Sequence, residues 1–165
     1  MSPDPTVLEK ISSRVNRTIE MLLFGLGASM AFVVALQVLF RYGLNQSLFW
    51  SEELARFFLV WLTFLGATVA YFRRLHPGVD VLYHRSPPAL RQAADIVVHS
   101  ASLLLFLVMV VYGWRFAYFV RLQITPALNL PKWIVFGIVP VSGLVLTLHA
   151  LPRLIAAATG TRRDH

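Results

Sequence analysis

Four long apolar stretches dominate the chain, and short polar segments separate them. The first, residues 21–40, holds twenty consecutive residues without a charged side chain. At a helical rise of about 1.5 Å per residue, this length covers the roughly 30 Å hydrocarbon core of a bilayer. Similar stretches occupy residues 54–72, 96–118 and 133–151. We therefore predict four membrane spans in a single membrane domain, residues 1–165.

All four spans are expected to be helical, because lipid offers the backbone no hydrogen-bonding partner and the stretches lack the alternation of a barrel. The predicted fold is an all-α integral membrane protein. Pro140 lies inside the fourth span, where its missing N–H predicts a kink. A signal peptide is the competing interpretation of the first stretch, but the apolar run is too long and acidic residues interrupt the basic leader.

The segment before the first span, residues 5–20, predicts an amphipathic helix at the membrane interface. Its apolar residues recur at helical spacing, and charged residues occupy the remaining arc. The apolar positions are Val7, Leu8, Ile11, Val15 and Ile19. A disordered leader is the alternative for this segment.

Basic residues set the expected orientation. Ten of the fifteen Lys and Arg residues fall on the side of the two termini and the middle loop. By the positive-inside rule, both termini are then cytoplasmic, and the first and third loops face outward. The sequence predicts a multi-pass membrane protein; in a bacterium it would lie in the inner membrane, with its outer loops facing the periplasm.

Composition narrows the function classes. The chain is 57% apolar and 14% charged, with a net charge of +7. Its basic residues are scattered singly, so we expect membrane lipid headgroups as their partners and no nucleic acid. The chain has no cysteine and no HExxH, GxSxG or Gly-rich phosphate motif, so we expect no enzyme activity, cofactor or metal.

Polar residues gather at the outer start of the second span. Trp50 falls at the expected interface, and Ser51 is a candidate helix N-cap. Glu52 and Glu53 follow in the first turn, where acids complement the positive helix end, and either is spaced to pair with Arg56. Two interpretations remain open: a rim on which a partner protein docks, or simply an anchored helix start.

A second polar cluster, formed by Arg73, Arg74, His76 and Asp80, follows the second span. The arginines are expected to anchor the chain in the cytoplasmic headgroups. His76 and Asp80 would share a helical face, but the Pro-Gly pair between them favours a turn, and proton transfer is the minor alternative.

Two histidines, His99 and His149, fall near the cytoplasmic ends of the third and fourth spans. Such a pair can ligate a b-type haem, but isolated histidines near span ends are more often held by neighbouring helices. A haem-binding anchor of a redox complex is therefore one alternative function.

No carboxylate lies deep within any apolar stretch, although ion-coupled transporters use such groups to bind the coupling ion. This argues against a second alternative, a stand-alone small transporter. Small residues recur at helix-packing spacing, for contacts within the chain or with another subunit. They are Gly25 with Ser29, Ala31 with Ala35, and Gly66 with Ala70.

Three blocks of the sequence carry a family resemblance. They are residues 50–56 with Trp61, residues 64–67 with the later His76 to Asp80, and residues 130–133 followed by Pro140 and Gly143. Together with four spans, these blocks resemble the small permease subunit (DctQ-like) of tripartite ATP-independent periplasmic (TRAP) transporters.

The resemblance implies a membrane scaffold for a large permease, which performs sodium-coupled uptake of an organic acid delivered by a periplasmic solute-binding protein. It marks one set of residues as candidates for partner docking or subunit contact: Trp50, Glu52, Glu53, Arg56, Trp61 and Gly66. A second set is expected in the cytoplasmic headgroup layer or its turn: Arg73, Arg74, His76 and Asp80.

Overall fold

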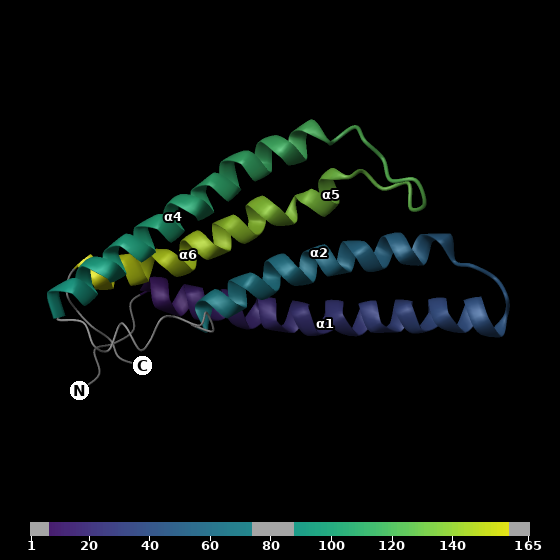
Figure 1. Cartoon of the computed structure of the whole chain (residues 1–165), viewed down its shortest axis with the longest axis horizontal. Coiled ribbons are helices and arrows are strands. Elements are labelled where there is room, and N and C mark those ends of the chain that lie inside the picture. The colour runs from purple at the N-terminus through teal and green to yellow at the C-terminus, as the bar shows by residue number, and fades with distance from the viewer. Residues whose placement is uncertain (1–6, 74–87, 159–165) are drawn as a thin grey trace.

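The computed structural model describes residues 7–73 and 88–158, which are almost entirely helical (Figure 1). The helices are α1 (Val7–Gly43), α2 (Phe49–Phe72), α4 (Pro88–Phe119), α5 (Trp133–Phe136) and α6 (Ile138–Ala158). Four segments are long and apolar enough to cross a membrane: Lys10–Gly43, Phe49–Phe72, Ala93–Phe119 and Trp133–Ile155. The predicted all-α fold with four spans is confirmed.

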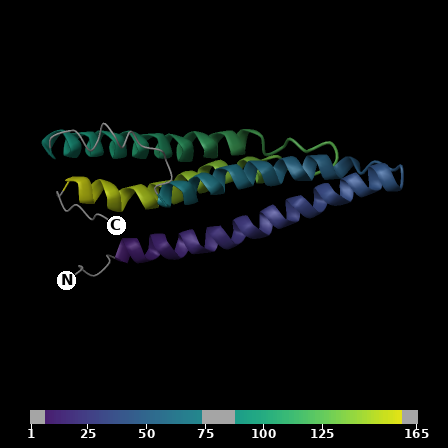
Figure 2. The same ribbon diagram turned by 60° about the horizontal axis from the view of Figure 1, so that its bottom comes forward.

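The helices form two antiparallel pairs, which α2 and α6 join. α1 packs mainly against α2, and α4 packs most extensively against α6. Figures 1 and 2 show the start of α1 and the end of α6 at the same end of the molecule. Both described ends of the chain therefore lie at the same end of the helix bundle.

α1 is one continuous helix of 37 residues, from Val7 to Gly43. The structure shows no boundary between the predicted amphipathic segment, residues 5–20, and the span that follows. At about 1.5 Å per residue the helix is roughly 55 Å long, well beyond the roughly 30 Å hydrocarbon core. The position of its first turns at the membrane interface stays a prediction.

The fourth span is interrupted between α5 and α6, as Pro140 leads one to expect. The interruption falls at Gly137 rather than at the proline. Because Pro140 has no N–H, the carbonyl of Phe136 lacks its usual donor four residues on. The Gly137 N–H bonds to Trp133 O at 2.7 Å, while the next bond, from Val141 N to Gly137 O, is long at 3.4 Å.

The packing of α4 against α6 involves glycines that the spacing argument did not select. A Cβ atom on Gly113 of α4 would lie 3.0 Å from Pro140 Cδ, and one on Gly143 of α6 would lie 3.1 Å from Phe106 O. By contrast, no atom lies within 4 Å of such a Cβ on Gly25 or Gly66. Within this chain, α4 and α6 meet at Gly113 and Gly143, whereas Gly25 and Gly66 face open space.

Candidate functional site

The first turn of α2 carries the polar residues of the predicted docking rim. The helix begins at Phe49, and its N-cap residue is Leu48, which has an extended backbone and no side-chain cap. The prediction that Ser51 caps the helix is wrong, because the first turn already closes through the bond from Ser51 N to Leu48 O at 3.1 Å. Ser51 is fully buried, and its Oγ donates to the same carbonyl at 2.7 Å.

Arg56 pairs with Glu52, one of its two predicted partners. The distance from Arg56 Nη2 to Glu52 Oε1 is 3.1 Å. Both side chains are largely exposed, at 69% and 72%, so the pair adds only a few tenths of a kcal/mol in water, about 0.3–0.5. Its charges stay accessible to another molecule.

Glu53 has a different partner, the loop between α4 and α5. Its Oε2 accepts hydrogen bonds from the backbone N–H groups of Ala127 and Leu128, both at 2.9 Å. An ionised acceptor makes such bonds stronger than neutral ones. Sequence analysis missed this contact, since backbone donors leave no signature in the side chains.

The loop itself, residues 120–132, is folded by its own hydrogen bonds. Thr125 is buried, donates its N–H to Leu130 O at 2.9 Å and accepts from Leu130 N through Oγ1 at 3.1 Å. Asn129 has a φ of 52°, a left-handed conformation that asparagine tolerates well. Lys132 donates its N–H to Gln123 O at 2.8 Å and its Nζ to Gln123 Oε1 at 3.2 Å. These hydrogen bonds give the loop an ordered conformation beside the start of α2.

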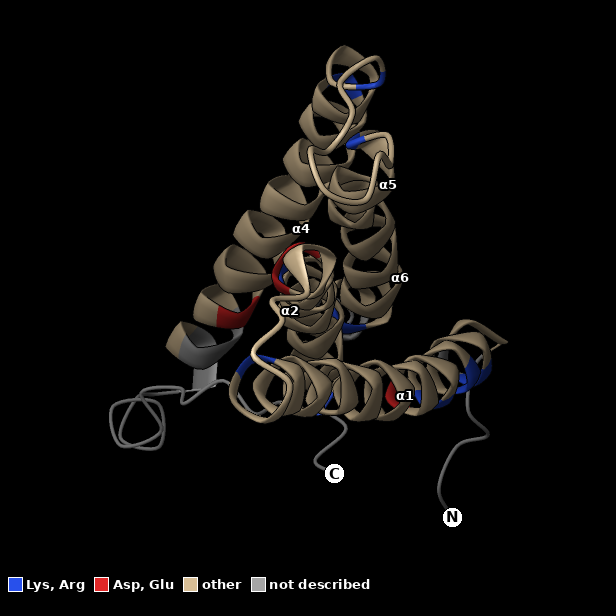
Figure 3. Cartoon of the chain, turned by 90° about the vertical axis from the view of Figure 1, so that its right-hand side faces the viewer, with Lys and Arg blue, Asp and Glu red and all other residues tan. Residues whose placement is uncertain are grey.

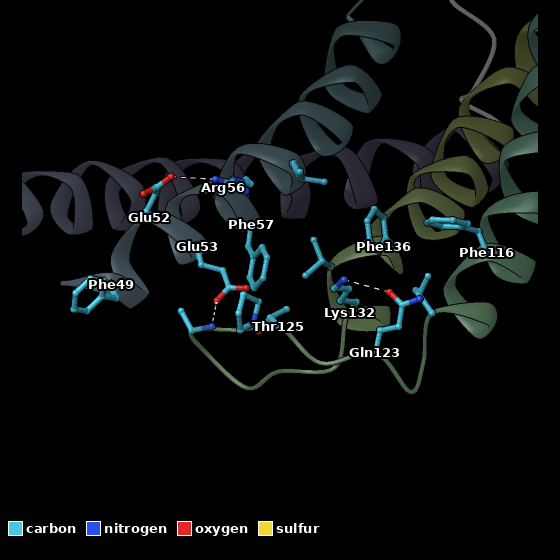
Figure 4. A pocket seen from close by; sticks show the side chains of 15 residues that line it. Phe49, Glu52, Glu53, Arg56, Phe57, Phe116, Gln123, Thr125, Lys132 and Phe136 are labelled. Carbon is cyan, nitrogen blue, oxygen red and sulfur yellow. Dashed lines mark hydrogen bonds and ion pairs between the residues drawn. The ribbon is translucent and has the colours of Figure 1, made fainter. Parts of the chain in front are cut away.

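A cavity of about 570 Å³ lies between α2, this loop and α5 (Figure 4). Its mouth carries two acids and two bases, and its walls are apolar. The charged residues are Glu52, Glu53, Arg56 and Lys132, and apolar walls come from Phe57, Val60, Phe116, Val135 and Phe136. Phe116 and Phe136 meet edge to face, with centroids 5.0 Å apart. The cavity thus combines charged and apolar side chains in one recess.

The other predicted docking residues lie elsewhere on α2. Trp50 is 38% exposed near the cavity but does not line it. Trp61 packs against the buried cluster of Ile19, Leu65 and Ile138. Gly66 lies further along the helix beside open space. The structure therefore brings Glu52, Glu53 and Arg56 to one site and leaves Trp61 and Gly66 outside it.

At the opposite end of α2, Arg73 joins α1. Its Nη2 and Nε lie 2.8 Å and 2.9 Å from Glu20 Oε1, and Asn16 Nδ2 donates to the same oxygen at 2.7 Å. Beyond the predicted headgroup contact, Arg73 thus holds two helices together. Arg74, His76 and Asp80 lie outside the described residues, so the expectations for them stay predictions.

His149 is buried on α6 and contacts α1 and α2 at this end. Its Nδ1 forms a hydrogen bond with Ser12 Oγ of α1, and its ring lies 5.0 Å from that of Phe72 in α2. Arg153 adds a bond from Nη2 to Phe72 O at 2.8 Å. His99 is half-buried on α4. The contacts of His149 agree with a histidine held by neighbouring helices.

Comparison with known proteins decides the family. Residues 30–160 match the family model described as "Tripartite ATP-independent periplasmic transporters, DctQ component". The chain belongs to the DctQ family. It is therefore a subunit of a TRAP transporter and a multi-pass protein of the inner membrane, in a family that implies a large permease partner.

Named relatives of this DctQ chain include separate small permeases. A putative TRAP transporter small permease protein of Haemophilus influenzae is 26% identical over 91% of this chain and 93% of its own length. The ectoine TRAP transporter small permease protein TeaB of Halomonas elongata is 26% identical over 89% of this chain and 77% of its own.

A third relative has a much longer chain. The isethionate TRAP transporter permease protein DctMQ of Oleidesulfovibrio alaskensis is 29% identical over 74% of this chain. The match covers only 21% of that protein. A DctQ-like segment thus also occurs as a minor part of a longer permease polypeptide.

Proposed function

We propose that this chain is the scaffold of a TRAP transporter. It holds a large permease that performs sodium-coupled uptake of an organic acid, which a periplasmic solute-binding protein delivers. The observation that carries this proposal is the open packing of α1 and α4. Only 6% of the most apolar window of each is buried within the chain, against 44% for the span that contains α6. Two of the four spans therefore offer most of their surface to a neighbour.

Three acidic residues in the described part of the chain, Glu20, Glu52 and Glu53, support a role without ion coupling. Sodium binding sites in proteins are built from oxygen ligands, and a transporter needs them within the membrane. Here Glu20 pairs with Arg73, and Glu53 accepts from the outer loop. Glu52 pairs with Arg56 at the outer surface. These carboxylates serve the structure of the chain, and we assign the coupling ion to the large permease.

The longer relative supports a fixed stoichiometry. A polypeptide that contains a DctQ-like segment within a larger permease keeps the two parts at one copy each. A separate small subunit that forms the same assembly would bind its large permease in the same ratio. We propose a one-to-one complex in which the exposed faces of α1 and α4 provide the contact surface.

The distribution of basic residues supports cytoplasmic termini. In that orientation the cavity at Glu52, Glu53 and Arg56 opens toward the periplasm, where the binding protein arrives. Its exposed charges and folded loop suit contact with a soluble partner. We propose that this rim, together with Trp50, contributes to docking of the loaded binding protein.

Co-expression tests the proposal. An affinity tag on this chain should recover the large permease in equal amount after detergent extraction. Reconstituted in liposomes, the complex should take up substrate only with a sodium gradient and the binding protein, and this chain alone should take up none. Failure to recover a stable complex, or transport by the small chain alone, would overturn the proposal.

A further inference from the structure

A second cavity, of about 320 Å³, is an apolar groove between α1, α2 and α6. It lies toward the end of the molecule opposite the docking cavity. Its apolar lining consists of Val15, Ile19, Leu22, Leu65, Val141 and Val145. These side chains form a strip of apolar protein surface between α1 and α6 that no other part of the described chain covers.

Positive charge gathers at one end of this groove. Arg14 lines the groove itself. Lys10 and Arg17 lie four residues before it and three after it, so all three project from neighbouring positions on one helix face. All three are exposed, and none forms an ion pair with Glu20, Glu52, Glu53 or Asp95, the carboxylates whose side chains the structure describes. Figure 3 shows basic residues near the start of α1.

The basic end and the apolar lining of the groove are complementary to the two parts of an anionic phospholipid, its headgroup and its acyl chain. From Arg14 to Leu22 the groove follows α1 for eight residues, a rise of about 12 Å into the span. Unpaired cations near a membrane surface attract anionic headgroups, while an apolar groove favours an acyl chain over water. A small soluble anion would leave the groove wet, and a neutral lipid would leave the cations without a counter-charge.

We propose that this groove binds one anionic phospholipid. Its phosphate lies against Arg14, with Lys10 and Arg17 beside it, and one acyl chain fills the strip between Ile19 and Val145. The lipid fills the space between α1 and α6, two helices that make few contacts with each other. Its leaflet is the cytoplasmic one in the orientation proposed above, but the binding itself does not depend on that orientation.

Native mass spectrometry of the detergent-purified complex with the large permease tests the charge end of this site. After addition of phosphatidylglycerol or phosphatidylcholine, the wild-type complex should retain one phosphatidylglycerol under activation that removes phosphatidylcholine. Arg14→Gln should lower the retained fraction about fivefold, as expected for the loss of one cation near a headgroup. Arg41→Gln removes the same charge at the other end of α1 and should change nothing. Equal losses in the two variants would show diffuse attraction and overturn the site.

A second pair of variants tests the groove. Val141→Trp places a ring in the strip and should displace the lipid. Leu59→Trp, at a site on α2 with a similar exposure of 53% and outside the groove, should leave the lipid bound. Thr18→Trp fills the groove from α1 and replaces the first variant if that one fails to assemble. Unchanged lipid retention in the groove-filling variants would overturn the proposal.

A cross-linking experiment tests the competing occupant, a helix of the large permease. The chain contains no cysteine, so Val141→Cys gives a single thiol beside the groove. We expect this thiol to react with a lipid-soluble maleimide and to form no cross-link with the large permease. Efficient cross-linking to that subunit would place protein, not lipid, in the groove and overturn the proposal.

Discussion

Glu53 on α2 holds the backbone of Leu128, 75 residues later in the chain, through a hydrogen bond of 2.9 Å. A second bond of equal length to Ala127 fixes the same loop. One carboxylate at the start of a membrane span therefore sets the position of the loop, residues 120–132, that borders the cavity shown in Figure 4.

Replacing this carboxylate should release the loop. In Glu53→Gln, the backbone N–H groups of Ala127 and Leu128 lose an ionised acceptor, and their hydrogen exchange should speed up on the order of tenfold. Hydrogen exchange of the purified complex measures this effect. Glu52→Gln is the matched control, because it changes the same charge at a residue that does not touch the loop. Equal exchange in both variants would contradict a clamping role.

Arg56→Ala should affect transport and leave folding nearly unchanged. Because its pair with Glu52 is exposed, loss of the pair should lower the stability of the chain by less than about 0.5 kcal/mol. Uptake driven by the binding protein should fall if the rim docks that protein. Thermal unfolding and liposome uptake of the same preparation separate the two effects. Loss of the complex with the large permease would instead indicate an anchored helix start.

Glycine substitutions should distinguish the internal helix contact from the outer faces. Gly113→Ala and Gly143→Ala place a methyl group about 3 Å from α6 or α4 atoms, and overpacking of this kind costs about 1–3 kcal/mol. Gly25→Ala and Gly66→Ala have open space and should leave thermal unfolding of the isolated chain unchanged. A Gly66→Leu variant that unfolds normally but no longer binds the large permease would place α2 in the subunit interface.

We predict that His149 stabilises the contact between α6 and α1 and does not bind haem. His149→Leu leaves the buried Ser12 hydroxyl without its partner and should lower stability by about 1–3 kcal/mol. The double variant Ser12→Ala with His149→Leu should recover part of that loss, because both polar groups are then gone. A reduced-minus-oxidised spectrum of the wild-type chain should show no Soret band. A Soret band that disappears in His149→Leu would revive the haem interpretation.

The features that sequence reasoning recovered are those carried by local pattern. The length of the apolar stretches predicted the four spans, and the spacing of four residues predicted the pair between Glu52 and Arg56. Ser51 was misplaced as a cap because the start of a helix depends on the preceding backbone, here the extended Leu48. That error places the start of α2 three residues too late, within a correctly predicted helix.

The features that it missed depend on contacts between distant segments. The clamp at Glu53 uses backbone donors from a loop that no side-chain pattern marks. The contacts of Gly113 and Gly143 depend on how α4 and α6 rotate toward each other. Spacing within one helix identifies a face that suits close packing, but it does not say which neighbour meets that face.

The interruption at Gly137 divides the last span into two mechanical parts. Residues 120–132 and α5 line the cavity shown in Figure 4 together with α2, whereas α6 makes most of the contacts of this span with α4 and α2. The long bond between Val141 and Gly137 is the weakest backbone link between these parts. A partner that pulls or tilts this loop and α5 would thus bend the fourth span at Gly137, and the contacts of α6 with α4 and α2 would be preserved.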